Sequence, residues 1–424
     1  MSNREQQLLG NIADIKLSNV DKKSNKDERE VRLCNYTDVY RNSFIDSLKA
    51  RNFMFASCNK KEFENFILRK GQVAITKDSE TRDDIGVPTY ISENFDDVVL
   101  GYHLALITPY EDKLNGRFLY YWLNSKQAIK YFENNAGGSG QRCTLPLDII
   151  KSIPINLPSL SIQQRIASVL SSFDSKIELN NCINAELEAM AKTIYDYWFV
   201  QFDFPDENGR PYKSSGRKMV WNEELKREIP LSWEVGNLSD IADITMGQSP
   251  PGNSYNDEGD GTIFFQGCTD FGVRFPTVRL YTTNPKRFAK LGDILLSVRA
   301  PVGSLNIAFS DCCIGRGLAA LRSKMDSNSY LFSVMKNLKQ IFDRRNVDGT
   351  TFGSITKQDL FSIKVLNPNK TILNSYNKII KPAFEKQNKI ELENKYLSNL
   401  RDWLLPMLMN GQVKVGNYQS DKIK

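Results

Sequence analysis

The chain of 424 residues is too long for one ordinary hydrophobic core, and its length favours two domains with connecting elements. Hydrophobic residues make up 41% of it and charged residues 25%, a balance that is typical of folded proteins and excludes an intrinsically disordered chain. The formal net charge of +6 does not by itself indicate a nucleic acid partner, but it excludes a strongly acidic protein, which would repel phosphates.

The sequence shows no signal for export or membrane insertion. The first residues, MSNREQQLLGNIADI, lack the apolar segment of a secretion signal. No apolar run approaches the roughly 18–20 residues that cross a bilayer. The seven cysteines are odd in number and form no Cys-x-x-Cys pair, so we expect packed, reduced thiols. The expected location is therefore cytoplasmic, without membrane contact.

Five short similarities between the two halves of the chain occur in the same order, which is the pattern of an internal duplication. The last and strongest is the tetrapeptide Lys-Ile-Glu-Leu, which occurs twice without change. One such match could be chance, but five in one order predict two copies of a domain. The matching pairs are 9–15 with 235–241, 101–105 with 315–319, 136–141 with 348–353, 148–150 with 359–361, and 176–179 with 389–392.

Each copy shows the same order of predicted elements. Short apolar runs bounded by glycines and turn residues predict strands at 72–76 in the first copy and at 293–298 in the second. A stretch with helical spacing follows at 119–130 and at 331–342. A glycine-containing segment and a long helix then complete each copy. The sequence therefore predicts an α/β (α+β) fold with two pseudo-symmetric mixed α/β domains, each followed by a helical arm.

The first arm is predicted to begin at a capping box in Ser161-Ile162-Gln163-Gln164. Apolar residues then recur at three- and four-residue steps and mark one helix face. The stripe lapses at Asn180 and Asn181, where polar groups in a helix–helix seam can fix register or orientation. From Ser161 to Phe199 this helix would be about 58 Å long. A small domain does not need so long a helix for its own core.

The second arm repeats the stripe, and Asn410-Gly411 is predicted to end it, while Pro382 should kink it or mark its first turn. One interpretation is that each arm packs only on its own domain. Equal lengths and matching stripes favour the other, in which the arms pack on each other as an antiparallel, coiled-coil-like spacer. The residues predicted to pair are Ile166, Phe173, Ile177, Leu187, Ile194, Ile390, Leu397, Leu400 and Leu404.

A search for catalytic chemistry finds no site. The single histidine, His103, argues against His-based catalysis or a His-rich metal site, and a structural role is expected for it. The phosphate loop G-x-x-x-x-G-K-[ST] does not occur. Ser249-Pro250-Pro251-Gly252 has glycine where an amino-methyltransferase needs an aromatic residue to stack on a flipped base, so it predicts a turn. We therefore predict no catalytic, cofactor-binding or metal-binding residues.

Basic residues in both copies are candidates for DNA contact. Those between 274 and 299 alternate with aromatic residues, an arrangement that suits phosphate contacts, and the arginines could read guanine edges. A solvated charged face explains such clusters as well. Arg142 and Lys357 follow the two glycine-containing segments, at places that the repeat suggests are equivalent. The predicted DNA-binding residues are Lys77, Arg82, Arg142, Arg274, Arg279, Lys286, Arg287, Arg299 and Lys357.

With these features in place, the chain resembles the specificity subunit of type I restriction–modification systems over essentially its whole length. Residues 157–167 (LPSLSIQQRIA) resemble the family's LPPLPEQQRIA entry to a spacer helix. Residues 198–205 (WFVQFDFP), continuing to 213, resemble its central region, and 229–234 (IPLSWE) its usual opening of a target-recognition domain. GQSPP at 247–251 and FFQG at 264–267 match the same domain. The first copy lacks the Ile-Pro-x-x-Trp opening and the Gly-x-Ser-Pro segment, so its DNA-contacting surface cannot be inferred from the second.

The resemblance implies a non-catalytic subunit in which two domains each bind one half of an asymmetric two-part DNA site. It implies double-stranded DNA, two methyltransferase subunits docked on the helices, and endonuclease–translocase subunits as partners. S-adenosylmethionine, ATP and magnesium would act on those subunits and not on this chain. Two alternatives stay open: the recognition subunit of a two-subunit type II-like enzyme, and an enzyme that acts alone. The implied organisation is recognition domain 1–158, central spacer helix 159–200, linker 201–228, recognition domain 229–368, C-terminal spacer helix 369–412 and tail 413–424.

Overall fold

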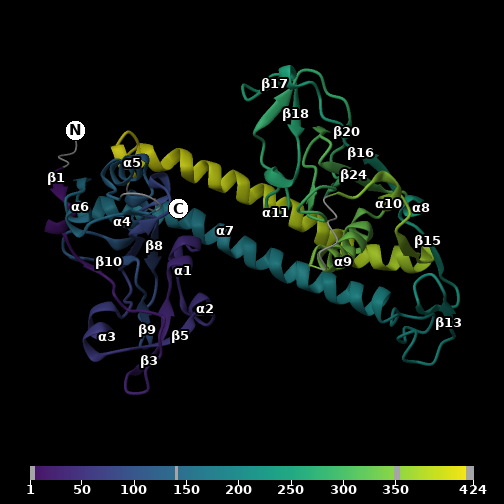
Figure 1. The fold of residues 1–424 in the computed structure, drawn as a ribbon, viewed down its shortest axis with the longest axis horizontal. Helices are drawn as coiled ribbons and strands as arrows, with labels where there is room; N and C mark the ends of the chain where they lie inside the picture. The colour runs from purple at the N-terminus through teal and green to yellow at the C-terminus, as the bar shows by residue number, and fades with distance from the viewer. Residues whose placement is uncertain (1–4, 139–141, 348–353, 417–424) are drawn as a thin grey trace, which may run out of the picture. The chain divides into compact units, whose positions relative to one another are not determined.

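The computed structural model describes residues 5–138, 142–347 and 354–416, which belong to two compact units (Figure 1). Unit 1 consists of Met1–Ile177 with Tyr396–Lys424, and unit 2 of Glu178–Lys395. Two long helices, α7 (Leu160–Tyr195) and α11 (Lys370–Asn410), each contribute one part to unit 1 and the other to unit 2. The parts of the two glycine-containing segments at 139–141 and 348–353 lie outside the described residues.

Unit 1 combines mixed sheets with short helices. Its strands are β1 (Glu5–Leu8), β2 (Ala13–Leu17), β3 (Arg29–Cys34), β4 (Phe44–Ile45), β5 (Met54–Cys58), β6 (Val73–Thr76), β7 (Asp78–Ser79), β8 (Pro88–Ile91), β9 (Val98–Leu100), β10 (Leu104–Pro109), β11 (Cys143–Thr144) and β12 (Pro154–Leu157). Its helices are η1 (Leu9–Asn11), α1 (Tyr36–Arg41), α2 (Ser47–Ala50), α3 (Lys60–Phe66), η2 (Arg82–Asp84), α4 (Gly116–Leu123), α5 (Lys126–Asn135) and α6 (Leu147–Lys151). The main sheet has the order β2-β10-β6-β8-β4, and a three-stranded sheet has the order β5-β3-β9.

Unit 2 has the same kind of architecture. Its strands are β13 (Met219–Asn222), β14 (Arg227–Pro230), β15 (Glu234–Asn237), β16 (Ala242–Met246), β17 (Tyr255–Asn256), β18 (Thr262–Phe265), β19 (Leu280–Thr282), β20 (Phe288–Ala289), β21 (Ile294–Ser297), β22 (Leu305–Ile307), β23 (Cys312–Ile314), β24 (Leu318–Ser323) and β25 (Lys364–Asn367). Its helices are the π-helix η3 (Asp196–Val200), α8 (Leu238–Ile241), η4 (Gly252–Ser254), η5 (Cys268–Asp270), α9 (Asn328–Val347) and α10 (Lys357–Phe361). One sheet has the order β16-β24-β21-β22 and another β17-β19-β18-β23-β20. The predicted mixed α/β class with two long helices is confirmed.

The duplication extends to the hydrogen-bond register. In unit 1 β10 lies between β2 and β6, and in unit 2 β24 lies between β16 and β21, with antiparallel pairing throughout. Leu104 is opposite Thr76 just as Leu318 is opposite Ser297. Two predicted matches are wrong. The sheet register aligns Ile12-Ala13-Asp14-Ile15 with the identical 241–244 segment, three residues away from the prediction. The Gly-Asn pairs that suggested the other alignment lie in different local structures, a 3-10 helix in unit 1 and a strand end in unit 2. The helices α6 and α10 align residues 148–150 with 358–360, one residue away from the prediction.

In the first half of the chain the helical predictions need two local corrections. The predicted helix at 119–130 is two helices, because Ser125 caps the start of α5 by accepting from the Ala128 amide. The capping box at Ser161 is wrong. Helix α7 begins one residue earlier, and Gln163 is fully buried, accepting from the Asn115 amide at 2.9 Å and donating to the Lys113 carbonyl at 2.9 Å. This side chain therefore ties the helix start to the loop before α4.

The end of the second long helix agrees with the prediction from the sequence, and its start does not. The Asn369 side chain caps its start by accepting from the Ile372 amide at 2.9 Å. Pro382 lies inside the helix and does not mark its first turn. The end is as predicted: α11 stops at Asn410, and Gly411 follows with a left-handed φ of 73°.

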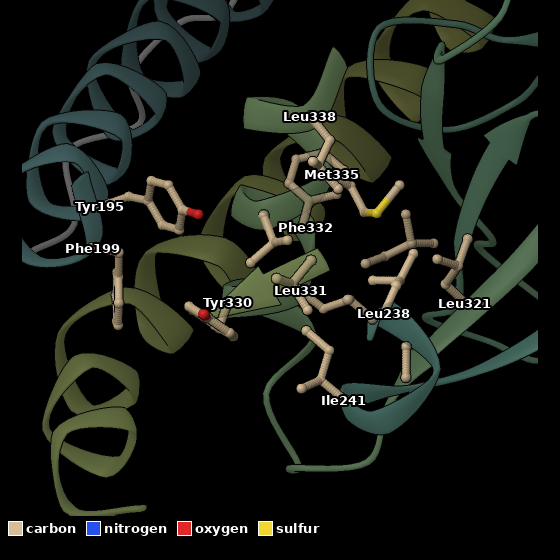
Figure 2. Packing of buried hydrophobic residues seen from close by; sticks show 14 of the residues in the cluster. Tyr195, Phe199, Leu238, Ile241, Leu321, Tyr330, Leu331, Phe332, Met335 and Leu338 are labelled. Carbon is tan, nitrogen blue, oxygen red and sulfur yellow. The ribbon is translucent and has the colours of Figure 1, made fainter. Parts of the chain in front are cut away.

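Unit 2 is organised around an aromatic core that holds the end of α7 (Figure 2). The ring centroid of Phe199, from η3, lies 4.8 Å from that of Tyr330 on α9 and 5.6 Å from that of Trp233. Phe204 stacks on Trp233 at 5.0 Å. The central region and the Ile-Pro-x-x-Trp segment thus form one buried cluster. Aromatic side chains bury large apolar areas, so this cluster fixes where the helix ends.

The core of unit 1 includes the start of α7 and the end of α11. Ile166 and Leu170 of α7 are buried with Leu408 and Met409 of α11 against the helices and sheet of the unit. The cysteines within the described residues form no disulfide. Cys34, Cys58, Cys312 and Cys313 are buried, as expected for packed thiols, whereas Cys143 and Cys268 are half-buried and Cys182 is exposed. Among all the residues that the structure describes, no helix combines the length and apolar character that crossing a membrane requires.

Candidate nucleic-acid interface

A recess in unit 2 brings three arginines together from separate loops. Its volume is about 290 Å³, and Arg279, Arg299 and Arg316 line it with Gln266 and Thr269. Gln266 and Thr269 lie in the loop after β18, and Arg299 lies in the loop after β21. Arg316 lies in the turn before β24, and Arg279 directly precedes β19. Arg279 and Arg299 are two of the DNA contacts predicted from the sequence, whereas Arg316, in the Gly-Arg-Gly segment at 315–317, is not among the predicted residues.

Arg279 is held in place by a carboxylate that the sequence analysis did not single out. Its Nε donates to Asp270 Oδ1 at 2.5 Å, and Nη2 pairs with the same oxygen. The Asp270 side chain is 6% exposed, whereas that of Arg279 is 56% exposed. The guanidinium has five N–H donors, so several remain for a ligand after Asp270 is satisfied. Arg279 is therefore oriented before any ligand binds.

Arg299 and Arg316 are both exposed, and within the described residues no carboxylate pairs with either of them. The Ser297 hydroxyl donates to the Arg299 carbonyl at 2.7 Å and fixes the backbone there. The Arg316 amide donates to the Ser249 hydroxyl at 3.3 Å. The recess thus holds two unpaired cations and one that is paired and oriented.

Glycines allow two backbones to meet at this recess. A Cβ added to Gly317 would lie 2.8 Å from the Gln266 carbonyl oxygen, so no larger residue fits there without a shift. A Cβ added to Gly267 would meet nothing within 4 Å, although Gly267 lines the recess. The FFQG and GRG segments therefore pack backbone to backbone, and only Gly267 leaves space for a side chain.

Unit 1 has a recess of about 370 Å³ at the corresponding place, with an acidic lining. It is formed by Asp78, Glu80, Asp84, His103 and Arg142, among others. The correspondence follows from shared backbone bonds. The Lys77 amide donates to the His103 carbonyl as the Val298 amide donates to that of Gly317, so Asp78 occupies the place of Arg299. The same position in the two copies thus carries opposite charges.

Asp78 is the centre of a polar cluster in unit 1. Its Oδ2 lies 2.8 Å from Lys77 Nζ and 2.5 Å from His103 Nδ1. Burial raises the pKa of Asp78, but hydrogen bonds from Lys77, Thr144 and His103 outweigh this and leave the pKa below its ordinary value. His103 has a structural contact, as expected. The ammonium group of Lys77 pairs with this carboxylate, and the Lys77 side chain is only 20% exposed.

The structure disfavours the DNA contact predicted for Arg274. This residue is 7% exposed, and its Nε donates to Asn388 Oδ1 of α11 at 2.5 Å. Its guanidinium also lies 4.4 Å from the centroid of the Phe384 ring. Burial lowers the pKa of Arg274 to about 10, while Glu188 and Glu391 raise it. Arg274 joins the domain to the helix, a role that spacing in the sequence could not reveal.

The other predicted basic residues are exposed and scattered. Arg82 lies in η2, Arg142 lines the recess of unit 1, and Lys286 and Arg287 precede β20. The proposed equivalence of Arg142 and Lys357 is wrong. Lys357 begins α10 as Leu147 begins α6, and the position that corresponds to Arg142 falls within 348–353, outside the described residues. The lysine is exposed, and its ammonium lies 5.1 Å from the centroid of the Phe361 ring.

The two long helices pack antiparallel, and each unit shows part of the contact. In unit 1, Arg401 Nη1 of α11 donates to Asp174 Oδ1 of α7 at 2.7 Å, and the Tyr121 hydroxyl donates to the other oxygen of Asp174. The predicted pairing residues are buried (Ile166, Ile390) or half-buried (Phe173, Ile177, Leu187, Ile194, Leu397, Leu400, Leu404). The interpretation in which each arm packs only on its own domain is therefore wrong, although both helices also enter domain cores.

Asparagines form a polar seam between the helices within unit 2, as predicted. Asn180 is 1% exposed, and its Nδ2 donates to Asn394 Oδ1 at 2.8 Å and to Glu393 Oε2 at 2.9 Å. Asn394 Nδ2 donates in turn to Asn181 Oδ1 at 2.9 Å. Buried amides need these partners, so the seam selects one register of α7 against α11.

Asn180→Ala is expected to lower the free energy of unfolding of the protein by about 1–3 kcal/mol, because it removes a buried donor from the seam and with it the hydrogen bond to the buried Asn394 Oδ1. Urea unfolding followed by circular dichroism measures this. Asn399→Ala, at an exposed position of α11, is the matched control and should change the free energy by less than about 0.5 kcal/mol. Equal effects of the two substitutions would contradict the role of the seam.

Comparisons with known proteins agree with this architecture. The family described as type I restriction modification DNA specificity domain matches residues 3–189 and 230–400. A putative type I restriction enzyme MjaX specificity subunit of Methanocaldococcus jannaschii is 32% identical over 330 residues, which cover 74% of this chain and 72% of that protein. The type I restriction enzyme HindI specificity subunit of Haemophilus influenzae is 24% identical over 87% of this chain and 94% of its own length.

A solved structure shows the same fold. The crystal structure of a type I restriction–modification S subunit from M. genitalium has a TM-score of 0.62 at 16% sequence identity, covering 96% of each chain. The family match covers most of the sequence, in two segments that contain the two copies of the duplicated domain. The chain therefore belongs to the family of type I restriction–modification DNA specificity subunits.

Proposed function

We propose that each recognition domain of this specificity subunit binds one half of an asymmetric, two-part site in double-stranded DNA. The observation that carries this proposal is the contrast between two copies of one fold. Asp78 and Arg299 occupy the same place, so one recess is acidic and the other basic. Base edges are distinguished by their donors and acceptors, and opposite side-chain charges favour different edges. Such copies would read different half-sites.

We further propose that α7 and α11 set the gap between the half-sites and dock two methyltransferase subunits. The polar seam and the Asp174–Arg401 contact support a fixed register between the helices. Endonuclease–translocase subunits would complete the assembly. S-adenosylmethionine, ATP and magnesium would bind to the partner subunits. The boundaries 1–158 and 229–368 for the recognition domains, with spacer helices at 159–200 and 369–412, a linker at 201–228 and a tail at 413–424, are part of the same proposal.

The purified chain alone is expected to bind DNA without methylating it, and methylation should require the methyltransferase subunits. Transfer of labelled methyl groups from S-adenosylmethionine to genomic DNA measures this, with the chain alone, the partner subunits alone, and the two together. Sequence-specific adenine methylation should arise only in the mixture. Methyl transfer by the chain alone would contradict the proposal, as would methylation without a two-part sequence.

A further inference from the structure

We infer that the recess formed by Arg279, Arg299 and Arg316 reads a guanine in the half-site of unit 2. The inference rests on the proposed function and adds to it the base class and the residues. Guanine presents two acceptors, O6 and N7, side by side in the major groove, and a guanidinium offers two parallel donors that match them. Among the residues that line the recess, three carry this group.

The Arg279–Asp270 pair favours readout of a base over attraction of phosphate. A site that works by charge alone gains nothing from a buried carboxylate, which removes one positive charge. Recognition of a base edge does gain from the buried carboxylate, because an arginine held at Nε and Nη2 keeps its remaining N–H donors in one orientation. Less side-chain freedom is then lost on binding. Arg279 is thus expected to donate to both O6 and N7 of the guanine. The unpaired Arg299 and Arg316 complete a lining that favours a ligand with hydrogen-bond acceptors.

The corresponding recess of unit 1 is not built for guanine. Asp78 stands where unit 2 has Arg299, and Glu80 and Asp84 line the same recess. Ionised carboxylates only accept hydrogen bonds, and guanine O6 and N7 are also acceptors, so the two do not bond to each other. Changes to the three arginines should therefore act on one half-site only, which gives the experiment an internal control.

The test uses the full chain assembled with its methyltransferase subunits and maps methylated sequences across a genome. Arg279→Gln, Arg299→Gln and Arg316→Gln should each reduce discrimination at one guanine of one half-site, by on the order of 10- to 100-fold for Arg279→Gln. The other half-site should not change. Arg210→Gln removes the same charge from an exposed residue outside the recess and should leave both half-sites as they are.

A glycine pair tests the recess without removing charge. Gly267→Leu places a side chain in the recess, in extended backbone and with nothing within 4 Å of the new Cβ, so folding should be retained. It should weaken recognition of the same half-site as the arginine variants. Gly252→Leu is the matched control, because its Cβ is also free of contacts and Gly252 does not line the recess.

Two results would overturn the inference while leaving the proposed function intact. In the first, the wild-type complex methylates a two-part sequence, and the arginine variants weaken methylation equally at all sequences, as loss of phosphate contacts would. In the second, the altered position is not a guanine. If the wild-type complex shows no sequence-specific methylation, the proposed function itself fails, so the two failures are distinguishable.

Discussion

Replacing residues 234–367 by the corresponding segment of a relative with another target is expected to change one half of the methylated sequence and preserve the other. The segment contains both partners of the β15–β25 pair and the whole arginine-lined recess. It leaves Trp233 and Tyr376 of the cluster that receives the end of α7 in place, and the relative should carry an aromatic residue at the position of Tyr330, which packs on Phe199. The core of unit 1 is formed by other residues and should fold as before.

Mapping of methylated adenines in cells that also produce the methyltransferase subunits measures this outcome. The reciprocal exchange of residues 5–157, which contains the β1–β12 pair, is the matched control and should change only the other half of the sequence. Changes in both halves after either exchange would show that the two domains do not read independently. Loss of methylation together with loss of folding would be recognised by circular dichroism and size-exclusion chromatography.

Insertion of seven residues into each long helix is expected to widen the tolerated gap by about three base pairs without changing either half-site. Seven residues add about 10.5 Å of helix, and a base-pair step is about 3.4 Å. The insertions belong after Lys176 in α7 and after Leu397 in α11, between the Asp174–Arg401 and Asn180–Asn394 contacts. A heptad changes the facing direction by only about 20°, so both contacts can form again.

Single insertions are the control for this design. Seven residues added to α7 alone leave α11 too short to form both contacts, so methylation should fall sharply and the free energy of unfolding should decrease. Four residues, about 6 Å of helix, test the same proposal with a different rotation, because each residue turns the helix by about 100°. An unchanged gap after the double seven-residue insertion would refute the role of the helices in spacing.

The sequence by itself determined the duplication, the fold class and the two long helices. These features depend on local patterns: apolar residues at helical steps, glycines at turns, and a polar lapse at Asn180 and Asn181 that the structure shows as a buried seam. Local patterns failed where a side chain has a distant partner. Gln163 lies within the segment predicted as a helix cap, yet its side chain bonds to the loop at 113–115.

Only the tertiary structure decided which basic residues line the recess of unit 2. Arg274 and Arg279 lie five positions apart in one basic stretch, yet packing of α11 over Arg274 buries it, while Asp270 orients Arg279 at the recess. Arg316 lies 37 positions after Arg279, in the loop between β23 and β24, and the pairing of β23 with β18 and of β24 with β21 brings it to the same recess. Exposure and charge partners are set by contacts between segments far apart in the chain, and spacing along the chain does not encode them.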